Sequence, residues 1–107
     1  MKYLTRKEEL VLLAVFQMKE DSYLVNIREY LNHNTEKKWT IGNVYVPLDR
    51  MSKMGLLESF VGAPNAKRGG KAIKYYRLTR EGYQALLEIK KVNDAMWQGF
   101  DSILFED

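Results

Sequence analysis

Basic side chains are concentrated in the middle of the 107-residue chain. Residues 37–80 carry ten Lys or Arg against two Asp or Glu, a net charge of +8. Residues 1–36 sum to −1, from five basic and six acidic residues, and residues 81–107 sum to −4, from two and six. Like charges repel, so core packing gives no reason for eight excess positive charges in this segment. A polyanion would bind these charges directly. The alternative is a solvated basic face, and the charge count alone leaves both open.

Catalytic and metal-binding chemistry finds little support in the residue types. The chain has no cysteine, which excludes thiolate nucleophiles, disulfides and cysteine-ligated metals. It has one histidine, His33. It also has no nucleophile elbow, no phosphate-binding loop and no pair of carboxylates in an apolar setting. We therefore expect a protein that is not an enzyme and that has neither a metal nor a cofactor.

Length and hydropathy predict a single globular domain outside the membrane. The chain has a mass of 12.6 kDa, with 46% hydrophobic and 29% charged residues. Its longest apolar run, Leu10 to Phe16, is seven residues, too short to cross a bilayer. Glu8 and Glu9 precede this run, where a secretory signal would carry positive charge. We expect a cytoplasmic protein with no membrane partner.

Helical periodicity and capping residues predict two helices at the start of the chain. Thr5 opens a capping box, followed by an apolar run, and this pattern predicts a helix over 5–18. Asp21 or Ser22 can cap a second helix near 22–33.

A third helix is predicted near 41–54, with Thr40 as its N-cap. Pro47 lies at an interior position, which would forfeit a hydrogen bond, so a later start near Asn43 is the alternative. The apolar stripe of this helix is Ile41, Val44, Leu48 and Met51. The opposite face of the helix is formed by Gly42, Val46 and Lys53, flanked by Asn43, Asp49 and Arg50.

A hairpin and a long last helix complete the expected order. Strands are predicted over 56–62 and 71–78, and the Pro- and Gly-containing segment between them reads as a hairpin loop. Thr79 is the predicted N-cap of the last helix. The apolar stripe of that helix is Ala85, Ile89, Val92, Met96, Phe100 and Ile103. This order predicts a mostly helical α+β fold, a winged helix-turn-helix with three helices, a two-stranded wing and a long C-terminal helix.

Two stretches of the sequence resemble the PadR family of bacterial transcriptional regulators. The first is Gly42-Asn43-Val44-Tyr45-Val46-Pro47-Leu48-Asp49-Arg50-Met51 with Gly55-Leu56-Leu57. The second is Gly69-Gly70-Lys71 with Tyr75-Tyr76-Arg77-Leu78-Thr79-Arg80-Glu81-Gly82. The similarity runs from about Leu10 to Leu87.

This resemblance implies a homodimeric repressor that binds an inverted repeat of double-stranded DNA. It divides the chain into a DNA-binding domain over 1–80 and, continuous with it, a C-terminal dimerisation helix over 81–107, as in short family members. Two residues depart from the family pattern: Asn43 replaces a small hydroxyl residue, and Ser22 replaces a glycine ahead of the second helix. The first departure prevents the transfer of a known operator sequence to this chain.

The predicted DNA-binding residues lie on the third helix and in the wing: Thr40, Asn43, Tyr45, Arg50, Lys53, Lys67, Arg68 and Lys71. Tyr45 matches a family position that contacts the DNA backbone, and its alternative is a half-buried packing tyrosine. Arg50 and Lys53 could reach phosphates or guanine edges, or lie on a solvated face; Arg50 could also pair with Asp49 or another carboxylate. Asn43 could read adenine or cap the helix. The first role of Thr40 is to cap the helix, and its second is to contact a phosphate. The wing cations favour phosphate or minor-groove contact over mere solubility.

The predicted dimer interface lies on the last helix and comprises Ile89, Val92, Met96, Phe100 and Leu104. The resemblance also implies that a flat aromatic or phenolic effector could stack on Trp97 between Met96 and Phe100. The alternative for Trp97 is a dimer-core residue with no ligand. A different functional class stays open as well, a winged helix used as a protein-interaction module without specific DNA binding.

Overall fold

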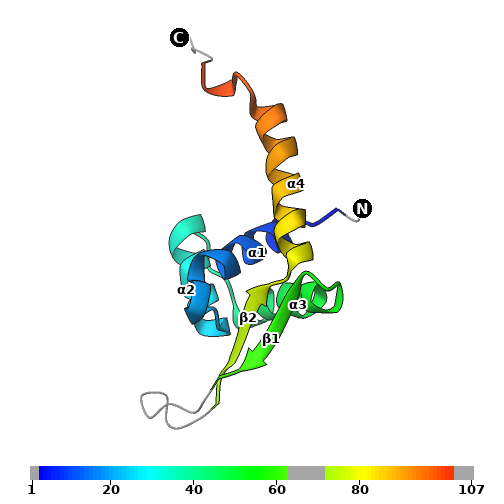
Figure 1. Ribbon diagram of the computed structural model, residues 1–107. Helices are drawn as coiled ribbons and strands as arrows, with labels where there is room; N and C mark the ends of the chain where they lie inside the picture. The colour runs from blue at the N-terminus through cyan, green and yellow to red at the C-terminus, as the bar shows by residue number, and fades with distance from the viewer. Residues whose placement is uncertain (1–2, 63–71, 103–107) are drawn as a thin grey trace.

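The computed structural model describes residues 3–62 and 72–102, which form a winged helix-turn-helix (Figure 1). Its elements in chain order are α1 (Arg6–Met18), the 3₁₀ helix η1 (Lys19–Asp21), α2 (Leu24–Thr35), α3 (Ile41–Lys53), β1 (Leu57–Val61), β2 (Lys74–Leu78), α4 (Arg80–Trp97) and the 3₁₀ helix η3 (Phe100–Ser102). The expected order of three helices, a hairpin and a long last helix is confirmed. Within the described ranges, no helix is long and apolar enough to cross a membrane.

Helix α1 is the centre of the fold and packs against α2, α3, β2 and α4. Its N-terminus has the predicted capping box: the Glu8 N–H donates to Thr5 Oγ1 at 3.1 Å, and the Thr5 N–H donates to Glu8 Oε1 at 2.8 Å. The buried core comprises Val11, Leu12, Ala14, Val15, Ile27, Leu31, Trp39, Val44, Leu48, Met51, Leu57, Tyr76 and Leu78. Three helices and the second wing strand thus pack on the helix that contains the apolar run after Glu9.

The predicted cap of the second helix is wrong. Helix α2 has Tyr23 as its N-cap, with no side-chain capping bond, and neither Asp21 nor Ser22 serves this role. Ser22 is fully buried, and its carbonyl accepts a hydrogen bond from the Tyr76 N–H at 2.8 Å. The helix ends at Thr35, two residues later than predicted, where Glu36 adopts a left-handed conformation at φ 56°. Pairing with the wing therefore determines where α2 begins.

Helix α3 begins at Ile41, so the alternative start near Asn43 is wrong. The Asn43 N–H donates to Thr40 Oγ1 at 3.1 Å, which confirms the predicted cap. Pro47 is buried together with Val44 and Leu48. Proline in a helix interior loses one backbone hydrogen bond, and here the cap and the burial of the apolar stripe outweigh that loss.

The wing is a two-stranded antiparallel hairpin whose second strand also pairs with the chain before α2. Its register pairs Leu57 with Leu78 and Phe60 with Tyr75, and both strands are shorter than predicted. Tyr23 forms an isolated antiparallel bridge with Tyr75, and the Tyr75 ring stacks on Phe60 with centroids 5.6 Å apart. These contacts support a hairpin that would be marginal on its own. The predicted wing residues Lys67, Arg68 and Lys71 lie outside the described residues.

Helix α4 projects from the winged domain away from β1 and β2, giving a molecule of 58 × 34 × 21 Å (Figure 1). The Gly82 N–H donates to the predicted cap, Thr79 Oγ1, at 3.1 Å. The expectation that the helix continues through Phe100 is wrong, because α4 ends at Trp97 and Gly99 has φ 78°. Phe100 begins η3 instead, and Leu104 lies outside the described residues.

Candidate nucleic-acid interface

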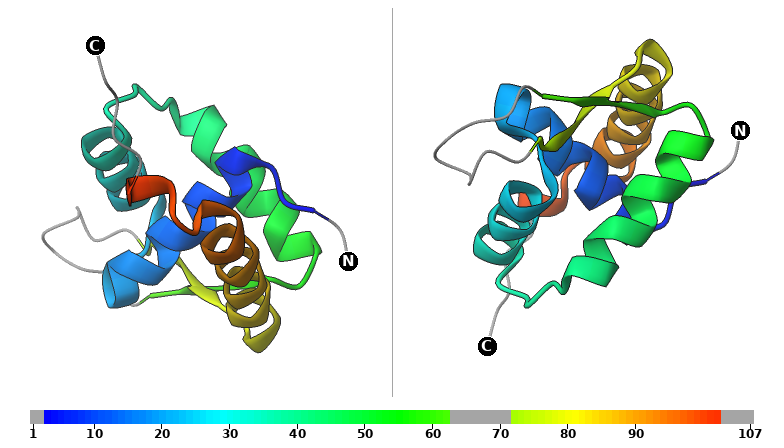
Figure 2. Two further views of the ribbon diagram at one scale, coloured as in Figure 1. Left: turned by 90° about the horizontal axis from the view of Figure 1, so that it is seen from above. Right: turned by 90° about the horizontal axis from the view of Figure 1, so that it is seen from below.

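One side of α3 faces solvent along its whole length. Of its predicted apolar stripe, Val44, Leu48 and Met51 are buried, whereas Ile41, in the first turn, is exposed. Pro47 is buried beside them, which turns Gly42, Asn43 and Val46 outward. Val46 is 65% exposed even though it is apolar. Seen from below, α3 lies in front and α4 runs behind the domain (Figure 2, right). We call the residues Gly42, Asn43, Val46 and Arg50 the outer face of α3.

Arg50 lies on this outer face and forms an ion pair with Glu8 of α1. The Glu8 side chain is 6% exposed and that of Arg50 is 48% exposed, so the pair is open to solvent on one side. Burial raises the pKa of Glu8, but the hydrogen bonds from Arg50 and Thr5 outweigh burial and leave that pKa below its ordinary value of 4.5. Arg50 thus has the structural role of joining α1 to α3, which is the predicted alternative of an ion pair with another carboxylate. Its predicted contact with DNA stays a prediction.

The other predicted residues of α3 are exposed. The ammonium group of Lys53 pairs with Asp49 at 2.9 Å, and this hydrogen bond raises the pKa of Lys53. Tyr45 is about half exposed, on the side of the helix next to the outer face. Thr40 caps the helix, and the Asn43 side chain is left exposed because the cap uses only its backbone N–H.

The strands of the wing add two described cations. Arg77 Nε donates to Glu58 Oε1 at 2.6 Å across the hairpin, and the Arg77 guanidinium lies 5.1 Å from the centre of the Phe60 ring. The ammonium group of Lys74 lies 5.5 Å from the Tyr76 ring centre. Positive charge was predicted at the loop of the hairpin. Arg77 and Lys74 are basic side chains on the strand itself.

A basic hollow of about 650 Å³ lies between the start of α1 and the connection from α2 to α3. The polar side chains that line it belong to Arg6, Lys7, Asn34, Thr35, Lys37, Lys38 and Asn43. Sequence reasoning missed this grouping because Arg6 and Lys7 fall in a segment whose net charge is −1. The available signal was two pairs of adjacent cations, Arg6-Lys7 at the start of α1 and Lys37-Lys38 in the connection to α3.

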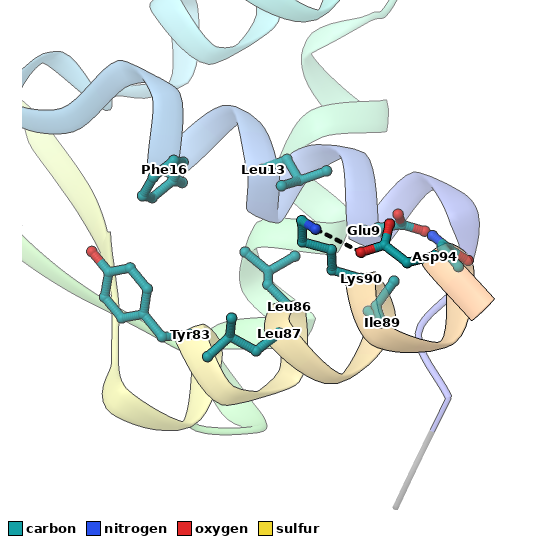
Figure 3. Close-up of a pocket in the computed structure, with 10 residues that line it drawn as sticks. Glu9, Leu13, Phe16, Tyr83, Leu86, Leu87, Ile89, Lys90 and Asp94 are labelled. Atoms are coloured by element: carbon teal, nitrogen blue, oxygen red, sulfur yellow. Dashed lines mark hydrogen bonds and ion pairs between the residues drawn. The ribbon is translucent and has the colours of Figure 1, made fainter. Parts of the chain in front are cut away.

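The C-terminal helix leaves most of its apolar stripe exposed. Met96 is 79% exposed, Val92 and Phe100 are exposed to lesser extents, and Ile89 is half-buried. The Trp97 and Phe100 rings meet edge to face, with centroids 4.8 Å apart. Between α1 and α4 lies an apolar groove of about 340 Å³, lined mainly by Leu13, Phe16, Tyr83, Leu86 and Leu87, with the Lys90–Asp94 ion pair at one end (Figure 3).

A winged helix-turn-helix with an exposed outer face on α3 defines the class of DNA-binding transcriptional regulators. The sequence matches the profile of the transcriptional regulator PadR-like family over residues 12–88. The chain therefore belongs to the PadR-like family, whose members are regulators and not enzymes.

Solved structures agree with this assignment. A PadR-like transcriptional regulator of Bacillus cereus is 26% identical, with a TM-score of 0.74 over 94% of this chain and 92% of that one. A transcriptional regulator of Thermoplasma acidophilum, described as putative, has the same fold at 17% identity, with a TM-score of 0.70 over 94% and 96%.

A mutant of MepR from Staphylococcus aureus, solved bound to an oligodeoxyribonucleotide, shares the fold at 20% identity. Its TM-score is 0.69 over 96% of this chain and 67% of that one. Among proteins of curated function, none matches the sequence significantly.

Proposed function

We propose that the protein is a homodimeric repressor that binds an inverted repeat in a promoter. Helix α3 of each protomer enters a major groove, and the two half-sites lie about one helical turn, roughly 34 Å, apart. The observation that carries this proposal is the outer face of α3, where small and uncharged residues, Gly42, Asn43 and Val46, leave room for base edges to approach. The DNA-bound MepR mutant of the same fold supports it.

The proposed contacts fall into two kinds. Asn43 reads a base, because its amide can bond adenine N6 and N7 together. Thr40, Tyr45, Arg50 and Lys53 contact phosphates or guanine edges beside it. The wing residues Lys67, Arg68 and Lys71 bind the neighbouring backbone or minor groove.

Dimerisation uses α4, whose exposed stripe is too apolar to be left in water over this length. In this proposal the residues at the two-fold axis are Ile89, Val92, Met96, Phe100 and Leu104. The apolar groove between α1 and α4 supports the same arrangement, since it offers a helix of the second copy a site beside Leu13 and Phe16. The N-terminal 80 residues then bind DNA, and residues 81–107 hold the dimer together.

A flat aromatic or phenolic ligand is the proposed inducer. Trp97 and Phe100 are both exposed in the single chain and already meet edge to face, a geometry that a third ring can join. Binding next to Met96 would change the angle between protomers, so that the two α3 helices no longer fit adjacent grooves.

The test is a titration of the purified protein against a duplex from its own promoter region and against a random duplex, at several salt concentrations. We expect the promoter duplex to bind at least about 10³-fold more tightly, with an affinity that falls steeply with salt. The Arg68→Ala/Lys71→Ala variant should bind both duplexes more weakly. Indifference to DNA at low salt would overturn the proposal and favour a protein-interaction module.

A further inference from the structure

We propose that the basic hollow binds a backbone phosphate of the DNA strand that borders the groove entered by α3. This inference rests on the proposed function and adds to it a second phosphate-binding site, separate from α3 and from the wing. The hollow has the required size, at about 650 Å³, and its polar lining offers only cations, amides and a hydroxyl. No carboxylate lines it.

Three cations of the hollow, Lys7, Lys37 and Lys38, differ in their pairing from the cations of α3 and from Arg77 of the wing, whereas the fourth, Arg6, pairs with Glu9 at 3.1 Å. Arg50, Lys53 and Arg77 are each paired with a carboxylate of their own chain. By contrast, no described residue forms an ion pair with Lys7, Lys37 or Lys38. Cations without an internal partner have their full charge available for an external anion.

The connection that carries Lys37 and Lys38 is held rigidly by Trp39, which is buried. The Trp39 N–H donates to Asn32 Oδ1 at 2.6 Å, and its indole N–H donates to Thr35 Oγ1 at 3.0 Å. The Trp39 carbonyl accepts from Arg28 Nε at 3.0 Å. These three bonds fix the backbone of the connection to α2, so a bound phosphate would order little more than the two lysine side chains.

The α1 side of the hollow points to the same ligand. Lys7 lies in the first turn of α1, where the helix dipole disfavours positive charge, so helix stability gives no reason for it. Arg6, next to it, pairs with Glu9 of the same helix. The ammonium group of Lys7 lies 6.0 Å from the centre of the Trp39 ring, facing the lysines of the connection. Binding of a polyanion gives a reason for a cation at this position, whereas helix stability does not.

The hollow is continuous with the outer face of α3. Lys7 and Asn43 line it and also line a neighbouring hollow of about 300 Å³ that reaches Val46 and Arg50. A DNA strand beside α3 would therefore pass from this neighbouring hollow into the basic hollow. Its bases would face α3, and its phosphates would face Lys7, Lys37 and Lys38.

The experiment measures the salt dependence of DNA binding for Lys37→Gln/Lys38→Gln. Each phosphate contact adds about 0.9 to the slope of log affinity against log salt, so the slope should fall by about 1.8. Between 50 and 200 mM salt, the variant should then lose roughly 12-fold less affinity than the wild type. The reduction should be equal for promoter and random duplexes, since phosphate contacts carry no sequence information.

Two further variants make the result decisive. Lys7→Gln, on the other side of the hollow, should lower the slope by about 0.9. Lys90→Gln/Lys91→Gln removes the same charge as Lys37→Gln/Lys38→Gln from exposed positions of α4, outside residues 1–80, and should leave the slope unchanged. A wild-type slope in Lys37→Gln/Lys38→Gln, or a loss confined to promoter DNA, would overturn the site while DNA binding itself stands. Failure of the wild type to bind either duplex at 50 mM salt would overturn the proposed function and this site together.

Discussion

The ion pair between Glu8 and Arg50 joins α1 to α3, and cutting it with Arg50→Met should destabilise the domain. Glu8 is 4% exposed, and its carboxylate accepts hydrogen bonds from the Thr5 N–H and from the Arg50 guanidinium. In Arg50→Met, the carboxylate stays buried with the Thr5 N–H as its remaining donor. Methionine keeps the length and the apolar stem of the arginine side chain but removes its charge.

The expected loss in the free energy of unfolding is about 2 kcal/mol. Removing one partner of a fully buried ion pair costs about 3–5 kcal/mol. Here the guanidinium is 48% exposed, so solvent already reaches one side of the pair, and the Thr5 bond survives. Both facts reduce the penalty to roughly half of the buried-pair range.

The loss should depend on pH in a defined direction. In the wild type, the pKa of Glu8 lies below 4.5, so its ionisation stabilises the fold above that pH, and this contribution is lost as the pH falls through the folded-state pKa. In Arg50→Met, the hydrogen bond and the charge of Arg50 no longer lower the pKa of Glu8, while burial still raises it. The pKa of Glu8 is therefore higher in the variant than in the wild type. The stability difference between the two proteins should therefore be largest near neutral pH. It should narrow in acid, as Glu8 becomes protonated first in the variant and then in the wild type.

Urea unfolding at one fixed protein concentration measures this difference. The matched control is Glu8→Gln/Arg50→Met, because glutamine preserves the capping box and no longer leaves a buried charge unpaired. The double variant should recover most of the lost stability. A loss below about 0.5 kcal/mol in Arg50→Met, or no recovery in the double variant, would refute the reasoning.

Two further predictions concern α4. Gly82→Ala should destabilise the fold by about 3 kcal/mol in thermal or urea unfolding, because a Cβ there would lie 2.2 Å from the Leu56 carbonyl oxygen. Gly42→Ala, with no heavy atom closer than 4.0 Å, should be neutral or stabilising by up to about 1 kcal/mol, and equal effects at both sites would contradict this account. Met96→Asp should convert the proposed dimer to monomer in sedimentation velocity at micromolar concentration, whereas Lys91→Asp should not. A monomeric wild type would disprove the dimer.

Local signals in the sequence were enough to predict most element positions. Thr5, Thr40 and Thr79 each cap the helix that follows them, because a cap needs only residues three positions apart. The apolar stripes likewise identified the buried faces of α1 and α3. Together these signals predicted the winged helix-turn-helix and, with it, the class of protein.

The errors arose where distant residues determine the structure. The start of α2 depends on the pairing of Ser22 and Tyr23 with β2, more than 50 residues away in the sequence. The partner of Arg50 is Glu8, 42 positions distant. The basic hollow combines Lys37 and Lys38, from the segment with the excess positive charge, with Arg6 and Lys7, from a segment whose net charge is −1. Spacing within one segment cannot predict such contacts, since they exist only after the helices have packed.

The base of the wing is secured independently of the chain between its strands. The Tyr23–Tyr75 bridge, the Tyr76–Ser22 hydrogen bond and the Phe60–Tyr75 stacking all lie at the described end of the hairpin. We therefore expect loops of other lengths and charges between β1 and β2 to cost little fold stability. In evolutionary terms, such a base lets a lineage exchange wing loops, and with them any preference for the DNA flanking an operator, while the scaffold stays the same. For protein engineering, the same segment is the natural place to begin a loop library.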